Sequence, residues 1–447
     1  MHPTQLSQAQ HRLWLLGQLF PERALVNLSM ALRLRGKLDF EALSWTIREI
    51  GRRHDALRSE ILVHGDEPYQ VVKSLELGLC AEDYSKLPEP ERSRMIEKRV
   101  DRELCRPFDH SRAPLIRFFL LREADDQHLL LTVVSHVVFD RFSFDILRRE
   151  LSELYAARVQ RRAPAPAPAA QARFADFARR QAPERERRVQ AENLEYWRER
   201  LHAIPPSLDL PGDRVRREPS FTAERTRLVL TAGDSEALRA LAIASGAGLE
   251  ALGLAALEVT LARYSAQSDF VVGVLTQARD ADSSAVIGMF EDYMAQRAEL
   301  LAAHDFDELL LRVREGLSQG LAHRELPLQE LAQLLARARD PTKNPLFQLT
   351  FACLDAHSDT RAMGSLELEL VPTFTGAGGL SDLSCVLRDE GGLLSLELDT
   401  TRDLYDAETG ARLCRSWRRV LQAVAQGRPR ALAELPVIAA EDERHLL

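Results

Sequence analysis

The segment ARVQRRAPAPAPAAQAR, residues 157–173, most constrains the fold, because alanine and proline alternate along it. Such a run favours extended polyproline geometry and offers little surface to bury, as in a hinge or a spanning linker. At 447 residues the chain is also too long for one ordinary core. We therefore predict two domains, 1–175 and 176–447, each large enough to hold its own core.

The first half predicts alternating helices and strands. Asp39 is a good N-cap for a helix whose apolar residues recur at helical spacing over 40–50. Residues 115–121 and 128–134 are apolar runs separated by a polar turn, a pattern typical of a hairpin. Ser143 is predicted to cap the helix that follows.

The second half repeats this mixture. Helical spacing is found at 234–246, 248–265, 305–321 and in a closing helix around Trp417. Runs that favour strands are found at 270–274, 346–353, 364–371 and 393–399. The predicted fold class is therefore α/β (α+β), with two lobes and a cleft or tunnel between them.

The composition limits which binding partners and which cellular compartment are expected. The 59 basic and 67 acidic residues leave a net charge of −8, which argues against nucleic acid and anionic membrane as partners. No apolar run approaches the ~20 residues that cross a bilayer, and the N-terminus has no stretch like a signal peptide. The five cysteines form no CxxC pair, so we expect reduced thiols, no metal site and a cytoplasmic protein.

A histidine, His136, directly follows the buried strand in TVVSHVVFDRFSF, residues 132–144. An unperturbed imidazole has a pKa near ~6.5 and is the natural proton acceptor at neutral pH. Asp140, one helical turn on, could orient this loop through an arginine. The alternative is that His136 caps the strand or fills a polar niche, since an HxxxD spacing alone is a weak signal. No phosphate loop, HExxH, GxSxG or paired-carboxylate motif competes with it.

Seven segments, in order along the chain, carry a family resemblance. They are LSQAQHRLWLL (6–16), RRHDALRSEI (52–61), SHVVFDRFS (135–143), RFADFA (173–178), IGMFEDYMAQR (287–297), HRELPLQEL (323–331) and RDPTKNPLFQLTF (339–351). Together they resemble the motifs of the condensation domains of nonribosomal peptide synthetases, which belong to the chloramphenicol-acetyltransferase-like superfamily.

The resemblance implies an architecture. Two lobes form a V with a tunnel between them; residues 1–175 are the N-terminal lobe, which carries SHVVFDR, and 176–447 the C-terminal lobe, with floor-loop and latch-type crossovers. Phosphopantetheine arms of a donor and an acceptor carrier protein enter from opposite faces, and the motif's second histidine, here His136, lies midway. No tightly bound cofactor and no metal are implied, and we expect a monomer.

The resemblance also assigns roles. The acceptor's amine or hydroxyl attacks the donor acyl thioester, while His136 takes the nucleophile's proton or positions it. Asp140 is expected to make a structural salt bridge, with Arg279 or Arg58 as partner. The fifth and seventh motifs place three further residues at the floor of the tunnel: Glu291, Asp292 and Asn344.

Three departures from the motifs matter. Ser135 replaces the first histidine, as in terminal domains that release peptides by cyclisation, and Arg141 replaces a glycine. The usual Phe-Val-Asn-Thr run of the fifth motif has two acids, Glu291 and Asp292, at its Val and Asn positions. Opposite charges gained together suggest pairing, so we hypothesise that Arg141 bridges to Glu291 or Asp292 and narrows a tunnel mouth. The alternative is that Arg141 points to solvent and both acids lie on an exposed loop.

Two classes of function remain open. The first is an acyltransferase that forms an amide or ester between carrier-bound partners, or releases a chain. The second is a catalytically silent domain that serves as a docking platform for a tailoring enzyme or a carrier protein. Epimerisation and heterocyclisation are disfavoured, because their motifs differ at the histidine pair. The closing LPVIAAEDERHLL resembles a lead into an adenylation domain, so a free-standing protein and an excised domain both remain open.

Overall fold

The computed structural model describes residues 3–65, 67–164, 166, 174–180, 183–205, 207–216, 220–324, 326, 330–332, 343–344, 346–355, 362–373, 381–427, 431–438 and 442. The chain divides into two compact units. Unit 1 consists of Met1–Arg185, Gln277–Glu291 and His357–Ala377, and unit 2 of Glu186–Thr276, Asp292–Ala356 and Gly378–Leu447. Sequence reasoning placed the division at 175/176, whereas the first change of unit comes after Arg185, and two later segments belong to unit 1. Within the alanine-proline segment 157–173, residues 165 and 167–173 lie outside the described residues.

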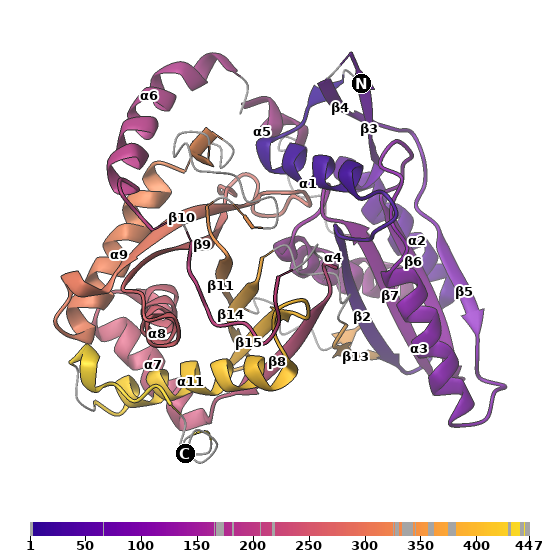
Figure 1. The fold of residues 1–447 in the computed structure, drawn as a ribbon. Helices are drawn as coiled ribbons and strands as arrows, with labels where there is room; N and C mark the ends of the chain where they lie inside the picture. The colour runs from indigo at the N-terminus through magenta and orange to yellow at the C-terminus, as the bar shows by residue number, and fades with distance from the viewer. Residues whose placement is uncertain are drawn as a thin grey trace. The chain divides into compact units, whose positions relative to one another are not determined.

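Unit 1 contains a six-stranded sheet in the order β12-β13-β2-β7-β6-β5 and a three-stranded sheet in the order β1-β4-β3 (Figure 1). Its strands are β1 (Thr4–Gln5), β2 (Asn27–Arg35), β3 (Ser59–His64), β4 (Glu67–Val72), β5 (Leu79–Asp83), β6 (Ile116–Ala124), β7 (Gln127–Ser135), β12 (Ala362–Met363) and β13 (Leu366–Val371). Its helices are α1 (Gln8–Leu19), α2 (Phe40–Arg53), the short η1 (Asp55–Arg58), α3 (Glu91–Leu104), α4 (Arg141–Val159) and α5 (Phe174–Arg180). In the larger sheet β5 and β6 are parallel, and the other neighbours are antiparallel.

The central strand β7 is buried along almost its whole length, because helices cover both faces of the sheet. Leu130 and Val134 pack in one cluster with α2 and α4, whereas Leu129, Leu131 and Val133 pack in another with α3. Side chains alternate between the two faces of a strand, so both faces must be apolar here. The predicted hairpin is confirmed as the antiparallel pair β6–β7.

Helix starts test the capping predictions. Asp39 is confirmed as the N-cap of α2, where its side chain accepts a hydrogen bond from the Ala42 N–H at 2.9 Å. The prediction that Ser143 caps α4 is wrong, because α4 begins at Arg141 and Asp140 is its N-cap. Both residue types cap helices well, and the buried carboxylate of Asp140 takes the capping position.

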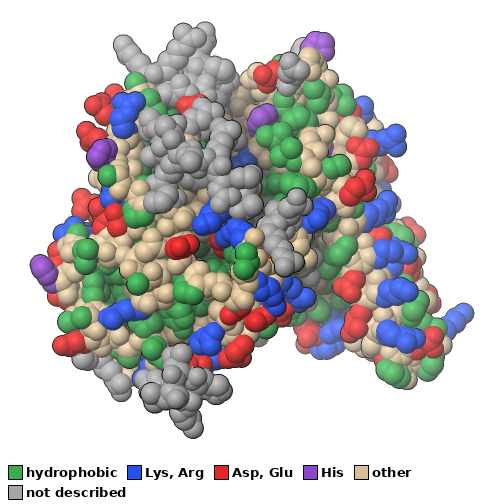
Figure 2. All heavy atoms as spheres, in the orientation of Figure 1, with side chains coloured by type: hydrophobic (Ala, Val, Ile, Leu, Met, Phe, Trp, Pro, Cys, Tyr) green, Lys and Arg blue, Asp and Glu red, His purple; other side chains and the backbone are tan. Residues whose placement is uncertain are grey.

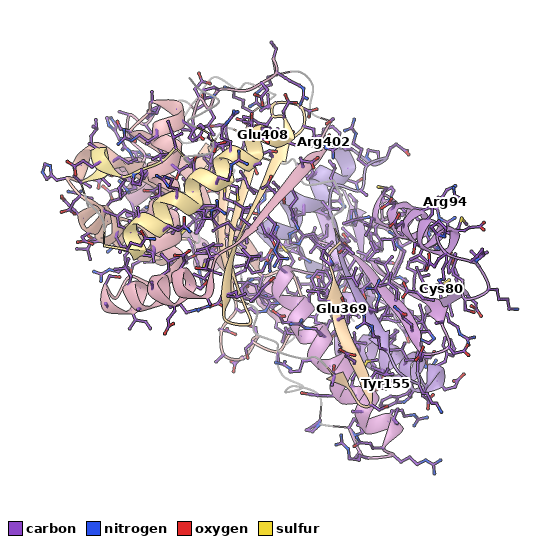
Figure 3. The ribbon with its side chains drawn as sticks, turned by 90° about the horizontal axis from the view of Figure 1, so that it is seen from below. Cys80, Arg94, Tyr155, Glu369, Arg402 and Glu408 are labelled. Carbon is purple, nitrogen blue, oxygen red and sulfur yellow. The ribbon has the colours of Figure 1, made fainter. Side chains whose placement is uncertain are left out.

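The predicted strand at 364–371 is confirmed as β13, but its partner is β2, far away in the sequence. Glu369 of β13 and Tyr155 of α4 are labelled in Figure 3. A turn at Gly364, with φ of +63°, precedes β13, a conformation that glycine adopts readily. Unit 1 therefore completes its sheet with a strand from the second half of the chain.

Unit 2 contains the second six-stranded sheet, in the order β10-β9-β11-β14-β15-β8. Its strands are β8 (Ala223–Val229), β9 (Asp269–Gln277), β10 (Glu291–Glu299), β11 (Leu349–Asp355), β14 (Leu383–Glu390) and β15 (Leu393–Thr401). Its helices are α6 (Pro183–Arg200), α7 (Ala232–Ala244), α8 (Gly248–Ser265), the short η2 (Leu300–Ala302), α9 (Phe306–Ala322), α11 (Ala407–Ala425) and the short η3 (Leu432–Glu434). The predicted helices and strands of the second half are confirmed, with shifted ends.

Both faces of this sheet are covered as well. Phe270, Val272 and Val274 of β9 pack with α7, α8, α9 and α11, whereas Val271 packs with Trp197 of α6. The predicted α/β class, with a sheet and a core in each half of the chain, is confirmed.

Helix α8 lies within the core of unit 2, with most of its residues buried. Among the described helices, none alone is long and apolar enough to span a bilayer. Helices α7 and α8 meet this length and apolar character only as a pair, and the chain bends by 108° between them. On the face drawn in Figure 2, basic and acidic side chains are interspersed.

Candidate active site around His136

His136 lies on the short loop between β7 and α4, where the backbone fixes its ring. Its N–H donates to the Val26 carbonyl at 2.6 Å, and its Nδ1 is 2.7 Å from the Phe139 carbonyl. A carbonyl only accepts hydrogen bonds, so Nδ1 carries the proton. In the neutral ring Nε2 then holds a free lone pair, which is the form that a general base requires.

The surroundings of His136 favour this neutral form. Burial, helped by the nearby Arg141 cation, lowers the pKa of His136 to about 4, against the opposing effects of the Phe139 carbonyl and Asp140. A charged imidazolium loses hydration energy in such a place. At neutral pH the ring is therefore uncharged, with Nε2 unprotonated.

The first sequence motif supports the His136 loop from α1. Gln10 is fully buried, and its side-chain N–H donates to the Val137 carbonyl at 2.9 Å. Its side-chain oxygen accepts from the Ser7 N–H at 3.1 Å, closing a capping box at the start of α1. Sequence reasoning named this motif without a role for Gln10; the S-x-x-Q capping pattern was the available signal.

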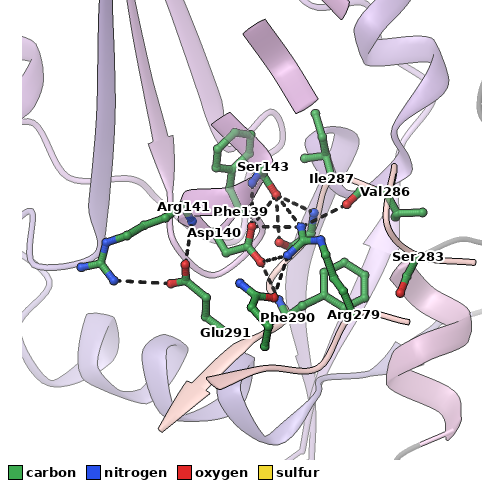
Figure 4. Close-up of polar contacts among 12 residues, drawn as sticks. Phe139, Asp140, Arg141, Ser143, Arg279, Ser283, Val286, Ile287, Phe290 and Glu291 are labelled. Carbon is green, nitrogen blue, oxygen red and sulfur yellow. Dashed lines mark hydrogen bonds and ion pairs between the residues drawn. The ribbon is translucent and has the colours of Figure 1, made fainter. Parts of the chain in front are cut away.

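Asp140 is fully buried and satisfied by hydrogen bonds from several directions (Figure 4). Its carboxylate accepts from the N–H of Ser143 at 2.8 Å, from the Ser143 hydroxyl at 2.7 Å and from the N–H of Phe290 at 3.1 Å. Arg279 completes the set through a two-pronged ion pair. Asp140 thus ties the start of α4 to the chain at 277–291.

Arg279 is the ion-pair partner of Asp140, for which the sequence left Arg279 and Arg58 as alternatives. Its guanidinium also donates to the Val286 carbonyl at 3.1 Å and lies 4.3 Å from the centre of the Phe290 ring. Arg58 lies elsewhere in unit 1, where it binds Asp55 at 2.5 Å and the carbonyl of Gly51 at 2.7 Å. The assignment of Arg58 as a partner of Asp140 is therefore corrected.

Gly288 packs tightly beside this network. The Ser143 hydroxyl lies 3.2 Å from both the N–H and the carbonyl of Gly288. A Cβ atom at this position would lie 2.3 Å from the Phe174 ring and 2.9 Å from the Phe290 ring. Only a residue without a side chain fits this approach.

Gly288→Ala is expected to lower the free energy of unfolding by about 1–3 kcal/mol, because the added methyl forces both rings to move. Denaturant unfolding measures the change. Gly78→Ala is the control, since a Cβ at Gly78 meets no atom within 4 Å. Equal stabilities of the two variants would contradict the tight packing at Gly288.

Ser135, in place of the motif's first histidine, is fully buried. Its hydroxyl is 2.9 Å from Nε2 of His110 and accepts from the Val137 N–H at 3.3 Å. Burial lowers the pKa of His110 to about 4, so this histidine is neutral as well. The two side chains satisfy each other, which gives Ser135 a structural place. Nothing in the sequence pointed to His110.

Glu291 and Arg141 are brought together, in a geometry different from the one hypothesised. The Arg141 guanidinium lies 3.6 Å from Oε2 of Glu291, beyond the ~2.7–2.9 Å of a charged hydrogen bond. The hydrogen bond comes instead from the Arg141 backbone N–H, which donates to Oε1 at 3.0 Å. Glu291 Oε2 also lies 3.6 Å from Nε2 of His136. The added carboxylate thus faces the imidazole directly, which sequence reasoning did not predict.

Glu291→Gln is expected to gain stability relative to wild type as the pH rises. Burial raises the pKa of Glu291 from 4.5 to about 7, so between these values the folded state holds this proton more tightly than the unfolded state. That contribution to stability is therefore lost as the pH rises through the window. The lowered pKa of His136 acts in the opposite direction, in both proteins, and largely cancels in the comparison. Thermal unfolding at about pH 5 and about pH 8 measures the difference in Tm; a difference independent of pH would contradict this account.

The other two floor-loop predictions fall in unit 2. Asp292 accepts a hydrogen bond from the Thr276 hydroxyl through its carbonyl at 3.1 Å. Asn344 accepts through its side chain from the N–H of Leu346 at 3.0 Å, which forms a turn just before β11. Neighbouring Pro345 lies outside the described residues.

Unit 2 also contains a cavity of about 400 Å³. Two arginines line it, and carboxylates pair with both: Arg214 with Asp406 and Arg216 with Asp382. Within the described part of the chain, no group of three or more His, Cys, Asp or Glu side chains is arranged to hold a metal ion. The clearest candidate for chemistry is therefore His136, with Glu291 beside it.

Comparison with known proteins places this site in a family. The family model for the Condensation domain matches residues 2–447. Phosphinothricin tripeptide synthetase PhsC of Streptomyces viridochromogenes is 35% identical over 99% of this chain, and the chain spans 41% of its length.

Solved structures agree. The X-domain from teicoplanin biosynthesis is 28% identical with a TM-score of 0.84, covering 98% of both chains. The starter condensation domain of rhizomide synthetase RzmA shares the fold, at 17% identity with a TM-score of 0.82, covering 98% of this chain and 100% of that one. The seven-motif resemblance, the fold with a six-stranded sheet in each unit and the match over residues 2–447 agree: this chain belongs to the condensation domain family.

Proposed function

We propose that this domain is an acyltransferase of nonribosomal peptide biosynthesis, joining a carrier-bound acyl or peptidyl donor to a nucleophilic acceptor. The observation that supports this most is the state of His136. Its Nδ1 is held by the Phe139 carbonyl at 2.7 Å, and its lowered pKa keeps Nε2 unprotonated at neutral pH. A fixed, neutral imidazole is the arrangement that a general base needs.

In the proposed reaction the acceptor's nitrogen or oxygen attacks the carbonyl carbon of the donor thioester. Nε2 of His136 takes the proton that the nucleophile loses, the C–S bond breaks, and the proton passes to the departing phosphopantetheine sulfur. No acyl-enzyme forms. Most of the rate enhancement comes from alignment of two tethered substrates, for which effective molarities reach ~10⁵–10⁸ M. The phosphopantetheine arms arrive with the carrier proteins, and no other cofactor takes part.

Reconstitution tests this proposal. The protein is mixed with a donor carrier loaded with an acyl or peptidyl group and an acceptor carrier loaded with an amino acid, and intact-mass spectrometry follows both carriers. Transfer of the donor mass to the acceptor carrier, dependent on this protein, is the expected result. No transfer across a panel of loaded carriers would contradict the proposal.

A second candidate function is a docking platform for a tailoring enzyme. The likeness to the X-domain favours it, because that domain has also been solved in a complex with OxyB, at 28% identity and a TM-score of 0.82 to this chain. The Arg141 and Glu291 side chains beside His136 are the departures that a silent domain would tolerate. Stable binding of a tailoring enzyme that is added to this reconstitution, without transfer between the carriers, would support the platform.

A further inference from the structure

Glu291 presents an unused hydrogen-bond acceptor to the imidazole. Its side chain is 1% exposed, and Oε2 has no hydrogen-bond partner within the part of the chain that the structure describes. Oε1 is occupied by the Arg141 N–H at 3.0 Å. Oε2 and Nε2 of His136 lie 3.6 Å apart. Two acceptors at this separation can both reach one nitrogen donor at ~2.8–3.0 Å.

A buried carboxylate without a close cation is unfavourable, and Arg141 supplies that cation only loosely. Its guanidinium is 3.6 Å from Oε2, and its side chain is 37% exposed. Little hydrogen bonding to Glu291 would therefore be lost if the guanidinium moved away. A second cation that binds at Oε2 as the guanidinium leaves would keep the negative charge of the Glu291 carboxylate balanced during the exchange.

We propose that Glu291 receives the ammonium group of an amine acceptor, in exchange for the Arg141 guanidinium, and accepts the first of the two protons that the acceptor must lose. This inference rests on the proposed acyltransferase function and deepens it. It commits the acceptor to an amine and the product to an amide. A hydroxyl acceptor carries no charge and would gain nothing from Glu291.

The protons balance along this route. An acceptor ammonium first gives one proton to the Glu291 carboxylate and becomes a free amine. The amine nitrogen attacks the thioester carbonyl carbon, and its second proton passes to Nε2 of His136 and then to the departing thiolate. Glu291 finally releases its proton to solvent. The sum is a thioester and an ammonium giving an amide, a thiol and one proton.

The proton affinities suit this exchange. An α-amino group has a pKa near ~8, and burial raises the pKa of Glu291 to about 7. Transfer between groups of such similar acidity needs little free energy. The neutral His136 beside them stays available for the second proton.

A comparison of two acceptors tests the inference. One carrier is loaded with an amino acid and the other with the 2-hydroxy acid of the same side chain, and single-turnover rates are measured with one loaded donor. Glu291→Gln is expected to lower the amine rate roughly 10–100-fold and the hydroxyl rate less than about 3-fold. Glutamine keeps a side-chain oxygen as an acceptor for the Arg141 N–H, so the loop remains anchored.

Glu258→Gln is the matched control, because Glu258 is also fully buried with a raised pKa and lies in α8 of unit 2. It should lower neither rate. A second readout is pH: the wild-type amine rate should level off above about pH 7, whereas the Glu291→Gln rate should keep rising to the amine pKa near ~8.

The outcomes separate the two proposals. Equal loss of both rates in Glu291→Gln would show a merely structural role, and no loss of the amine rate would show no role; either result overturns the inference and leaves the acyltransferase standing. A wild-type protein that transfers to neither acceptor overturns both.

Discussion

His136→Ala is expected to reduce the rate of condensation by about 10²–10⁴-fold, the usual contribution of a general base. Nε2 is the free base nitrogen of the site, and alanine removes it together with the Nδ1 contact to the Phe139 carbonyl. Single-turnover transfer between loaded carriers, followed by intact-mass spectrometry, measures the loss. We expect the affinities for the carriers to stay close to those of wild type.

Two comparisons make this prediction specific. His64→Ala removes an exposed histidine of β3 and should leave the rate unchanged. Ser135→Ala should be far milder than His136→Ala, because the Ser135 hydroxyl contacts His110 and cannot serve as a base near neutral pH. A His136→Ala protein with wild-type turnover would remove the general-base role.

The fall in reaction rate at low pH identifies the group whose protonation stops the reaction. The lowered pKa of His136, about 4, keeps it unprotonated well below pH 6. A fall in rate between about pH 5 and pH 7 therefore belongs to the carboxyl of Glu291, whose pKa burial raises to about 7, or to the acceptor amine. If the fall persisted unchanged in Glu291→Gln, the amine would be its source.

The position of the site could be predicted because its signals are local. The apolar run of β7 requires a buried strand, and residues just after a buried strand reach the edge of its sheet. His136 and Asp140 follow that run within five residues of each other, so their loop and the helix after it were visible in the sequence. The partner Arg279 came from the family resemblance, as one of two alternatives.

The rest depends on contacts between distant parts of the chain. His110 reaches Ser135, and Gln10 reaches the carbonyl of Val137, without any periodicity that marks them. Capping propensity also could not choose between Asp140 and Ser143; burial of the Arg279 ion pair decides for Asp140. The strand β8 escaped prediction because it alternates charged residues along a sheet edge, with Arg225 paired to Asp399 at 2.7 Å.

Asp140→Ala is expected to lower the free energy of unfolding by about 3–5 kcal/mol, the penalty for leaving one member of a buried ion pair alone. Asp140 is fully buried and the Arg279 side chain is 10% exposed, so water cannot compensate the arginine. The N–H of Phe290 would lose its acceptor as well, and the hydroxyl of Ser143 would lose the closer of its two acceptors. Denaturant unfolding measures the loss, and Arg279→Ala should produce a similar one.

A variant with both substitutions tests whether Asp140 and Arg279 stabilise the protein as a pair or independently of each other. Asp140→Ala combined with Arg279→Ala should lose less stability than the two single losses added, because the second change removes the charge that the first left unpaired. Asp125→Asn, in an exposed pair with Arg122, is the control and should change stability by less than about 1 kcal/mol. A stable Asp140→Ala protein with only a slower reaction would instead place Asp140 in the chemistry, because a scaffold residue cannot be removed without a loss of stability.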